Sequence, residues 1–346
     1  MNKKTGILVF KVLLSLGIMS YLFFSAWRTE QFQDLSLQRL DWGWMGLALL
    51  FCLAAHVVSY LRWRMMVRAL GIPFTPFDAI RIGFIGSFFN LFAFGVLGGD
   101  TLRAYYVTRQ VKHRVPETIS SVVADRLIGL LTMFSFASVA FLTADLTVIH
   151  SESNSDQMAA LIAACRTIVI VTLGGYGALL TLFLVPRVTQ TTSYQRVTGI
   201  PRIGPVIDRF SKVLIVYRHK LPTIGFCFLL SSVCVICFAS SIFFVACAIS
   251  SSPPTWADHF IITPIAMTAN AIPLPGGIGG MELAIDFLYL AFTPDGSDQR
   301  GIVVAFAFRV VLLATSTVGA IAWLTNRQTL AGLEIKTAIP QQKEPT

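Results

Sequence analysis

The stretch ANAIPLPGGIGGMELAIDF, from Ala269 to Phe287, contains two prolines, four glycines and two carboxylates, although it lies in one of the most apolar parts of the chain. A second, weaker copy, FNLFAFGVLGGDTLRAYY, runs from Phe89 to Tyr106. Proline and glycine interrupt helices, and non-helical backbone at membrane depth is tolerated where it lines a protein cavity. The two stretches therefore predict two interrupted helical segments inside a membrane.

The composition around them is that of an all-α polytopic membrane protein. The chain has 346 residues, of which 55% are hydrophobic and 13% are charged, against about 25% charged residues in soluble domains. Six apolar stretches are long enough to cross a hydrocarbon core of ~30 Å: Gly6–Ser25, Trp44–Leu61, Ile119–Thr143, Thr167–Val185, Pro222–Ile249 and Ile302–Thr325. We expect one transmembrane domain over residues 1–330 and a cytoplasmic tail at 331–346.

Basic residues are divided unequally between the two sets of connections. One set holds 20 of the 27 Lys and Arg residues, whereas the other holds Arg28, Arg39, Arg166 and Arg300. Because Lys and Arg mark the cytoplasmic side, both termini are expected in the cytoplasm, with the protein in the cytoplasmic membrane. The net charge of +9 then needs no nucleic-acid partner. The basic segment 201–220 reads either as an amphipathic helix on the cytoplasmic surface or as an ordinary basic loop.

Two apolar segments are too short or too broken for simple spans. Ile82–Leu97 has basic residues on both flanks, which predicts a re-entrant hairpin entered from the cytoplasm. Phe260–Phe292 has acidic residues on both flanks and PLPGG in its middle, which predicts a second hairpin entered from outside. The alternative makes Ile278–Phe292 a short full span, so the chain would have up to eight spans.

The order of these segments repeats with opposite orientation. Residues 43–145 contain a span, a hairpin and a span, and residues 222–325 contain the same series inverted. Arg126 follows Asp100 by 26 residues, and Arg309 follows Glu282 by 27. Inverted-topology repeats are typical of secondary transporters, which place their substrate site between broken helices near the midplane.

The candidate substrate-binding residues lie at the two hairpin tips and in the spans that follow. They are Asn90, Asp100, Arg103 and Arg126 in the first repeat and Asn270, Glu282 and Arg309 in the second. The candidate backbone positions are Gly98, Gly99, Pro273, Pro275, Gly276, Gly277, Gly279 and Gly280. An arginine at membrane depth costs about 2.5 kcal/mol or more unless it has a partner. One interpretation is a structural ion pair in each repeat, Arg126 with Asp100 and Arg309 with Glu282 or Asp286. The other, which is compatible with the first, is a pair of cations that receive an anionic substrate.

Enzyme signatures are missing from the sequence. It contains no Walker A motif, nucleophile elbow or HExxH motif. Its five histidines are scattered without metal-ligand spacing. We expect no cofactor, no metal and no hydrolysis of nucleotide by the chain itself.

Four motifs resemble those of the lysylphosphatidylglycerol synthase transmembrane-region family, whose members are described as flippase-like. They are GGDTLR at 98–103, ADRLIGLL at 124–131, PLPGGIGGMELAI at 273–285 and FRVVLLATSTVG at 308–319. The first hairpin departs from the family in lacking a proline before its glycines. In fused family members a soluble domain aminoacylates phosphatidylglycerol, and the membrane part moves the product across the bilayer. This chain ends at Thr346 without room for that domain, so the resemblance implies the translocation half.

Two functions follow as expectations. The first is translocation of an anionic phospholipid or lipid-linked molecule across the cytoplasmic membrane, with membrane lipid as substrate and a separately encoded lipid-modifying enzyme as partner. The second is a membrane enzyme, or an accessory subunit of one, that modifies or glycosylates lipids. The second function would favour carboxylates or histidines clustered at one membrane face, and here the acids occur in apolar segments.

Overall fold

The computed structural model describes residues 40–92, 96–110, 115–143, 155–184, 217–269, 279–292 and 301–325, with scattered positions between 195 and 208. Every regular element within these ranges is helical, which confirms the all-α fold. Five of the helices are long and apolar enough to cross a membrane: α2 (Trp42–Ala69), α5 (Val115–Thr143), α7 (Ser155–Leu184), α10 (Leu221–Ile249) and α13 (Gly301–Thr325). The chain is therefore a multi-pass membrane protein.

Five of the six predicted spans correspond to these helices, although two of the helices are clearly longer than predicted. α2 ends at Ala69, eight residues after the predicted end at Leu61. α7 begins at Ser155, twelve residues before the predicted start at Thr167, because the alanine-rich sequence before it favours a helix without being apolar enough to mark a span. The predicted first span, Gly6–Ser25, lies outside the described residues. So do the tail at 331–346 and most of the segment 201–220, which ends in a short 3₁₀ turn, η2 (Arg218–Lys220).

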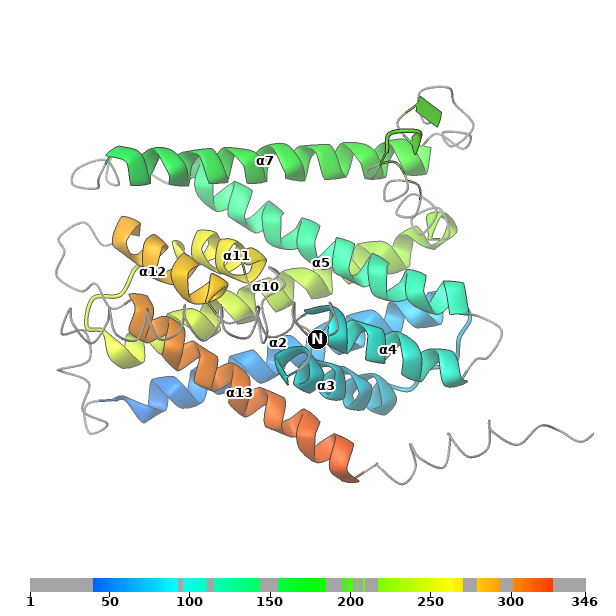
Figure 1. Cartoon of the computed structure of the whole chain (residues 1–346), viewed down its shortest axis with the longest axis horizontal. Helices are drawn as coiled ribbons and strands as arrows, with labels where there is room; N and C mark the ends of the chain where they lie inside the picture. Colours follow the sequence, from blue (N-terminus) through cyan, green and yellow to red (C-terminus); the bar gives the residue numbers. More distant parts are fainter. Residues whose placement is uncertain are drawn as a thin grey trace, which may run out of the picture.

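The centre of the fold is an antiparallel contact between α2 and α10 (Figure 1). Ser241 Oγ donates to the Ala48 carbonyl at 2.7 Å, and Cys234 Sγ donates to the Ala55 carbonyl at 3.5 Å. Small side chains let two helix backbones approach closely, which is how helices associate where hydrophobicity supplies no driving force. These two helices open the two predicted repeats and run in opposite directions, as an inverted repeat requires.

Each repeat continues with a pair of short antiparallel helices. In the first repeat, α3 (Pro76–Phe92) meets α4 (Val96–Gln110), where Arg103 Nη2 donates to the Gly83 carbonyl at 3.3 Å. In the second, α11 (His259–Ala269) meets α12 (Gly280–Phe292), where the His259 ring and the Tyr289 hydroxyl are 2.9 Å apart. Figure 1 shows the two pairs in opposite halves of the molecule. At ~1.5 Å per residue, none of these helices is as long as the ~30 Å core.

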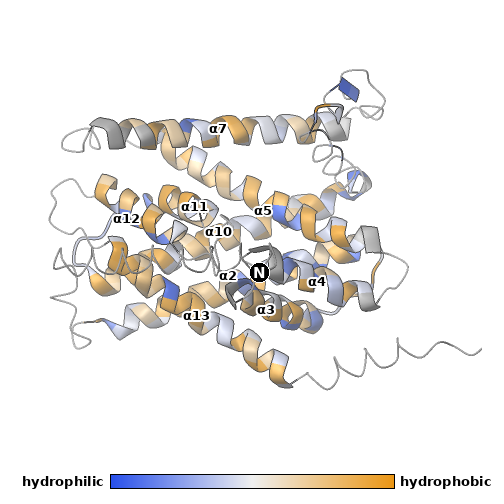
Figure 2. Cartoon of the chain, in the orientation of Figure 1, coloured by the Kyte–Doolittle hydropathy of each residue, from blue (hydrophilic) through white to orange (hydrophobic). Residues whose placement is uncertain are grey.

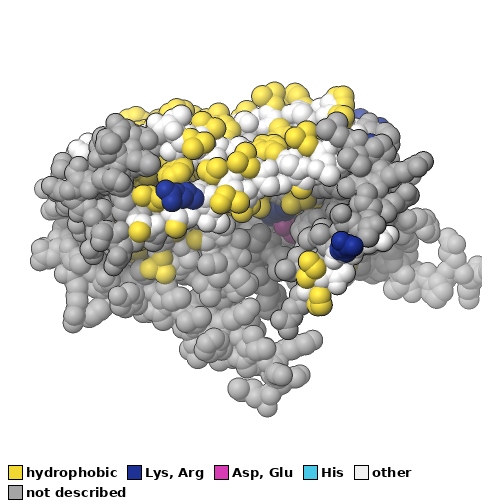
Figure 3. Space-filling model, turned by 90° about the horizontal axis from the view of Figure 1, so that it is seen from above, with side chains coloured by type: hydrophobic (Ala, Val, Ile, Leu, Met, Phe, Trp, Pro, Cys, Tyr) yellow, Lys and Arg dark blue, Asp and Glu magenta, His cyan; other side chains and the backbone are white. Residues whose placement is uncertain are grey.

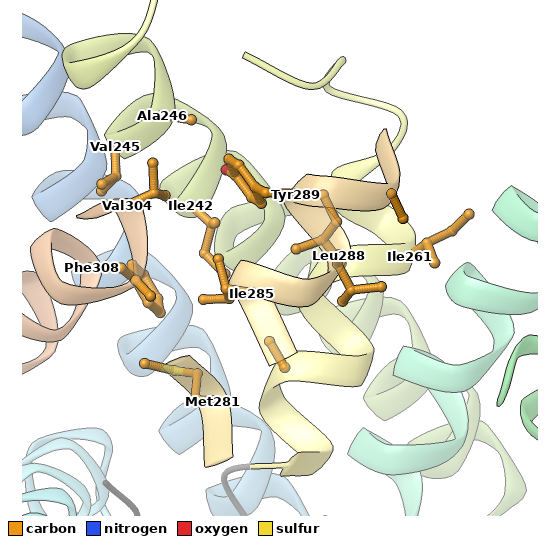
Figure 4. Close-up of a cluster of buried hydrophobic side chains, with 14 of the residues drawn as sticks. Ile242, Val245, Ala246, Ile261, Met281, Ile285, Leu288, Tyr289, Val304 and Phe308 are labelled. Carbon is orange, nitrogen blue, oxygen red and sulfur yellow. The ribbon is translucent and has the colours of Figure 1, made fainter. Parts of the chain in front are cut away.

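The largest hydrophobic cluster lies in the half of the molecule that contains α11 and α12 (Figure 4). Met281, Ile285 and Phe308 belong to it, so α12 and the first half of α13 are packed into the core. Most described positions of α7 and α13 are hydrophobic, and isolated hydrophilic positions occur in α5, α7 and α13 (Figure 2). Ile170, Leu173 and Ile321 are exposed on α7 and α13, as expected for helices that contact lipid.

α13 also crosses the first repeat, and this crossing depends on Gly319. A Cβ atom at that position would collide with the Phe84 carbonyl of α3. We expect Gly319→Val to lower the free energy of unfolding by about 1–3 kcal/mol, the usual cost of overpacking. Unfolding of the purified protein in mixed micelles would measure it. Gly174→Val in α7, where no atom lies within 4 Å of the new Cβ, is the matched control; equal losses from both variants would contradict the close crossing.

Candidate functional site

In the first repeat, Arg126 of α5 holds Asp100 of α4 in a bidentate ion pair. Arg126 Nε donates to Asp100 Oδ2 at 2.7 Å, and Nη2 donates to Oδ1 at 2.6 Å. The Arg126 side chain is 46% exposed and that of Asp100 is 14% exposed. Bidentate pairs between arginine and a carboxylate are among the strongest polar contacts in proteins. This pair is strong, but its arginine is open to the surroundings of the protein.

In the second repeat, Arg309 of α13 holds Glu282 of α12 in the corresponding place. Arg309 Nε and Nη2 donate to Glu282 Oε1 at 2.7 and 2.6 Å. The Arg309 side chain is 7% exposed and that of Glu282 is 0% exposed. The Glu282 Oε2 atom also accepts the Gly279 backbone N–H at 2.8 Å. Glu282 is the third residue of α12, so it caps the start of its own helix in the manner of a capping box.

The structure thus contains the ion pairs of the first interpretation, with Glu282 as the carboxylate that pairs with Arg309. It also places the first asparagine at the hairpin tip, where Asn90 Oδ1 accepts the Gly99 backbone N–H at 2.7 Å. Gly99 is packed so closely that a Cβ would collide with the Gly86 carbonyl. Gly279 has a φ of 104°, a left-handed conformation that favours glycine. Gly98 lies in α4 and Gly280 begins α12, whereas Asn270, Pro273, Pro275, Gly276 and Gly277 lie outside the described residues.

Arg103 joins the first site as a second cation beside Asp100. Its Nη1 atom lies 3.5 Å from Asp100 Oδ1, and its Nη2 atom donates to the Gly83 carbonyl at 3.3 Å and to Ser87 Oγ at 3.4 Å. The guanidinium also lies over the Tyr60 ring, 5.0 Å from its centroid, a favourable contact between a cation and an aromatic face. Arg103 is therefore buried and held from several sides.

Sequence reasoning missed a third ion pair, between Arg62 of α2 and Asp125 of α5. Arg62 Nε donates to Asp125 Oδ1 at 2.7 Å, and Nη1 donates to Ser231 Oγ of α10 at 2.7 Å. Both charged side chains are buried. Arg62 directly follows the predicted span Trp44–Leu61 and is one of the 20 basic residues in the connections expected on the cytoplasmic side. The available signal was the Asp125–Arg126 pair inside an apolar helix. Adjacent residues of a helix do not face each other, so Asp125 needs a cation from another helix.

Acidic and basic side chains lie within a hollow on one face of the molecule (Figure 3). The described part of this face is largely apolar, with further Lys and Arg side chains at separate places on it. Within the described ranges, no group of three or more His, Cys, Asp or Glu side chains gathers that could hold a metal ion. A guanidinium that holds a carboxylate in this way can also hold another anion whose oxygens have the same geometry.

Fold and site together define a helical membrane protein with an inverted repeat and an arginine–carboxylate pair in each half. The chain belongs to the family described as the lysylphosphatidylglycerol synthase TM region, whose model matches residues 8–319. This confirms the resemblance drawn from the four motifs and places the protein among membrane proteins related to lipid metabolism. Comparison with curated proteins and with solved structures found no match.

Proposed function

We propose that the protein moves an anionic phospholipid or lipid-linked molecule across the cytoplasmic membrane, through a polar site between its two short helix pairs. The observation that carries this proposal is the repetition of one ion pair in two halves of opposite orientation, Arg126 with Asp100 and Arg309 with Glu282. In transporters built from inverted repeats, the corresponding broken helices of the two halves meet at one substrate site near the midplane. An arginine–carboxylate pair beside each broken helix fits that arrangement.

The ion pairs explain how such a site remains stable when it is empty. An arginine in the membrane costs about 2.5 kcal/mol or more without a partner, and the carboxylates supply that partner. A phosphate group offers the same bidentate geometry as a carboxylate, so it can replace the carboxylate at the guanidinium. The acyl chains would stay in the lipid while the headgroup crosses.

The proposal includes an orientation. Each short helix pair is antiparallel and would enter and leave the membrane on one side, as a re-entrant hairpin. The positive-inside rule puts α3 and α4 on the cytoplasmic side with both termini, and α11 and α12 on the opposite side. The protein itself would not be an enzyme, and a separately encoded lipid-modifying enzyme would supply or consume its cargo.

The test is lipid movement in proteoliposomes. The protein is purified with its native lipids, the lipid that co-purifies is identified, and its exchange between leaflets is followed. Loss of charge-assisted hydrogen bonds worth about 1.5–3 kcal/mol predicts that Arg126→Ala with Arg309→Ala slows exchange at least about tenfold.

Arg81→Ala is the matched control, because Arg81 forms an aspartate pair with Asp78 at the other end of α3, 3.2 Å apart. A folded double variant that moved lipid at the unaltered rate would overturn the proposal. A co-purified lipid-linked sugar or modified lipid, with no exchange in the unaltered protein, would favour the alternative of an enzyme or a subunit of one.

A further inference from the structure

We propose that the two ion pairs have unequal roles, an inference that rests on the proposed function and deepens it. Arg126 binds the phosphate oxyanion of the ligand. When the phosphate binds, the Asp100 carboxylate leaves Arg126 and pairs with Arg103, which is a positioning residue. Arg309 and Glu282 remain together as a structural clamp. The ligand chemistry is a phosphate monoester or diester, whose oxygens match the planar guanidinium group.

The charged side chains at the first site have a net positive charge, whereas those at the second site do not. In the first repeat one carboxylate, Asp100, lies between two arginines, Arg103 and Arg126, so the group carries a surplus of one positive charge. In the second repeat Glu282 is paired with Arg309, and the position three residues after Glu282 is Ile285 where the first repeat has Arg103. The next residue, Asp286, is acidic. An anion is therefore attracted to the first site and not to the second.

The geometry around Arg103 allows it to receive Asp100 without moving. Contacts with Gly83, Ser87 and Tyr60 fix its position. Its bond to Asp100 Oδ1, at 3.5 Å, is long for a hydrogen bond between charged groups. In the described part of the chain, the buried Arg103 Nε has no hydrogen-bond partner. A small rotation of the Asp100 side chain away from Arg126 would therefore strengthen its contact with Arg103, which is incomplete while Asp100 is paired with Arg126.

Accessibility separates the two arginines in the same way. Arg126 is 46% exposed, whereas Arg309 is 7% exposed. Opening the second pair would also cost more, because Glu282 is fully buried and accepts the Gly279 N–H in addition to its arginine. Its neighbour Met281 and the neighbour of Arg309, Phe308, both belong to the largest hydrophobic cluster (Figure 4). A charge released there would have no solvent to receive it.

Equilibrium binding tests the unequal roles without requiring translocation. The full chain in neutral detergent is titrated by calorimetry with a short-chain phosphatidylglycerol and, separately, with inorganic phosphate. Arg126→Gln should weaken binding about tenfold, from the loss of charge-assisted bonds. Asp100→Asn should tighten it severalfold, because Arg126 is released. Arg103→Gln should weaken it severalfold, because Asp100 then stays on Arg126, and Arg103→Lys should restore part of the loss.

The decisive comparison is Arg103→Gln in the Asp100→Asn background. A residue that acts mainly through Asp100 should have a much smaller effect on affinity there, limited to the loss of one nearby positive charge, whereas a ligand contact or a merely structural residue should weaken binding equally in both backgrounds. Equal losses in both backgrounds would overturn the role of Arg103. Equal losses from Arg126→Gln and Arg309→Gln, in variants with equal unfolding temperatures, would overturn the unequal roles.

The two probes distinguish this inference from the proposed function. Binding of phosphatidylglycerol with the expected pattern of variants, but no leaflet exchange in vesicles, would retain the phosphate site and refute translocation. Binding of inorganic phosphate alone, with the same pattern, would retain the site and identify free phosphate as its ligand. No binding of either probe to the unaltered chain or to Asp100→Asn would refute the inference itself.

Discussion

Asp125→Ala is expected to lower the free energy of unfolding by about 3–5 kcal/mol, because it leaves the guanidinium of Arg62 buried without its carboxylate. Arg62 would keep its bond to Ser231, 2.7 Å long, but Ser231 is neutral and also donates to the Cys227 carbonyl at 2.8 Å. The variant should therefore disturb the contact of α2 with both α5 and α10. Reversible unfolding in mixed micelles, followed by circular dichroism, would measure the loss.

The double variant Arg62→Met with Asp125→Leu should recover most of that loss, since apolar pairs of similar volume often replace buried ion pairs at little cost. Asp78→Ala is the matched control, because it breaks an aspartate–arginine pair with Arg81 that is partly exposed. Exposed pairs contribute about 0–1 kcal/mol. A loss for Asp125→Ala as small as that for Asp78→Ala would show that the buried pair does not stabilise the three-helix contact.

Glu282→Ala should lower the free energy of unfolding by a similar amount, for two reasons that can be measured separately. It removes the partner of buried Arg309, at a cost of about 3–5 kcal/mol for a stranded charge. It also removes the acceptor for the Gly279 N–H at the start of α12, a capping contact worth about 1 kcal/mol. Thermal unfolding would give the total, and hydrogen exchange at the amides of the first turn of α12 would report the capping share.

Glu282→Gln distinguishes the two contributions, because the amide oxygen can still accept one N–H while the negative charge is lost. We expect it to destabilise the protein, and to protect the first turn of α12 better than Glu282→Ala does. Identical exchange rates in the two variants would mean that Glu282 does not cap the helix. Wild-type stability in both variants would refute the clamp.

Much of the site could be predicted because its signals are local or repeated. The similar spacings, 26 residues from Asp100 to Arg126 and 27 from Glu282 to Arg309, are the basis of the ion-pair interpretation, and both pairs are present. The positions of α5, α10 and α13 follow from hydropathy, since an apolar run long enough to span lipid has little choice but to be helical. The family could be predicted from four short motifs taken together.

The rest depends on contacts between distant residues. Arg62 and Asp125 are 63 residues apart, and nothing in either neighbourhood specifies the other. The sequence also does not distinguish an exposed Arg126 from a buried Arg309, because both lie in apolar helices of similar composition. That difference arises from the packing of Met281 and Phe308 around the second pair, which is a property of the assembled core.

The contact of α2 with α10 has the form of an interface between two identical subunits. α2 ends at Ala69 and α10 ends at Ile249, so residues of the two helices that are 180 positions apart correspond. The counterpart of Ala55 is therefore Val235, and Ala55 contacts the adjacent Cys234. In a homodimer, such a self-complementary interface would require every charged residue to occur twice. Here the counterpart of Arg62 at the same offset is Ile242, and the counterpart of Arg103, when Asp100 is aligned with Glu282, is Ile285. Because one chain contains both halves, mutation can give a single half an unmatched cation, which no symmetric pair of subunits can acquire.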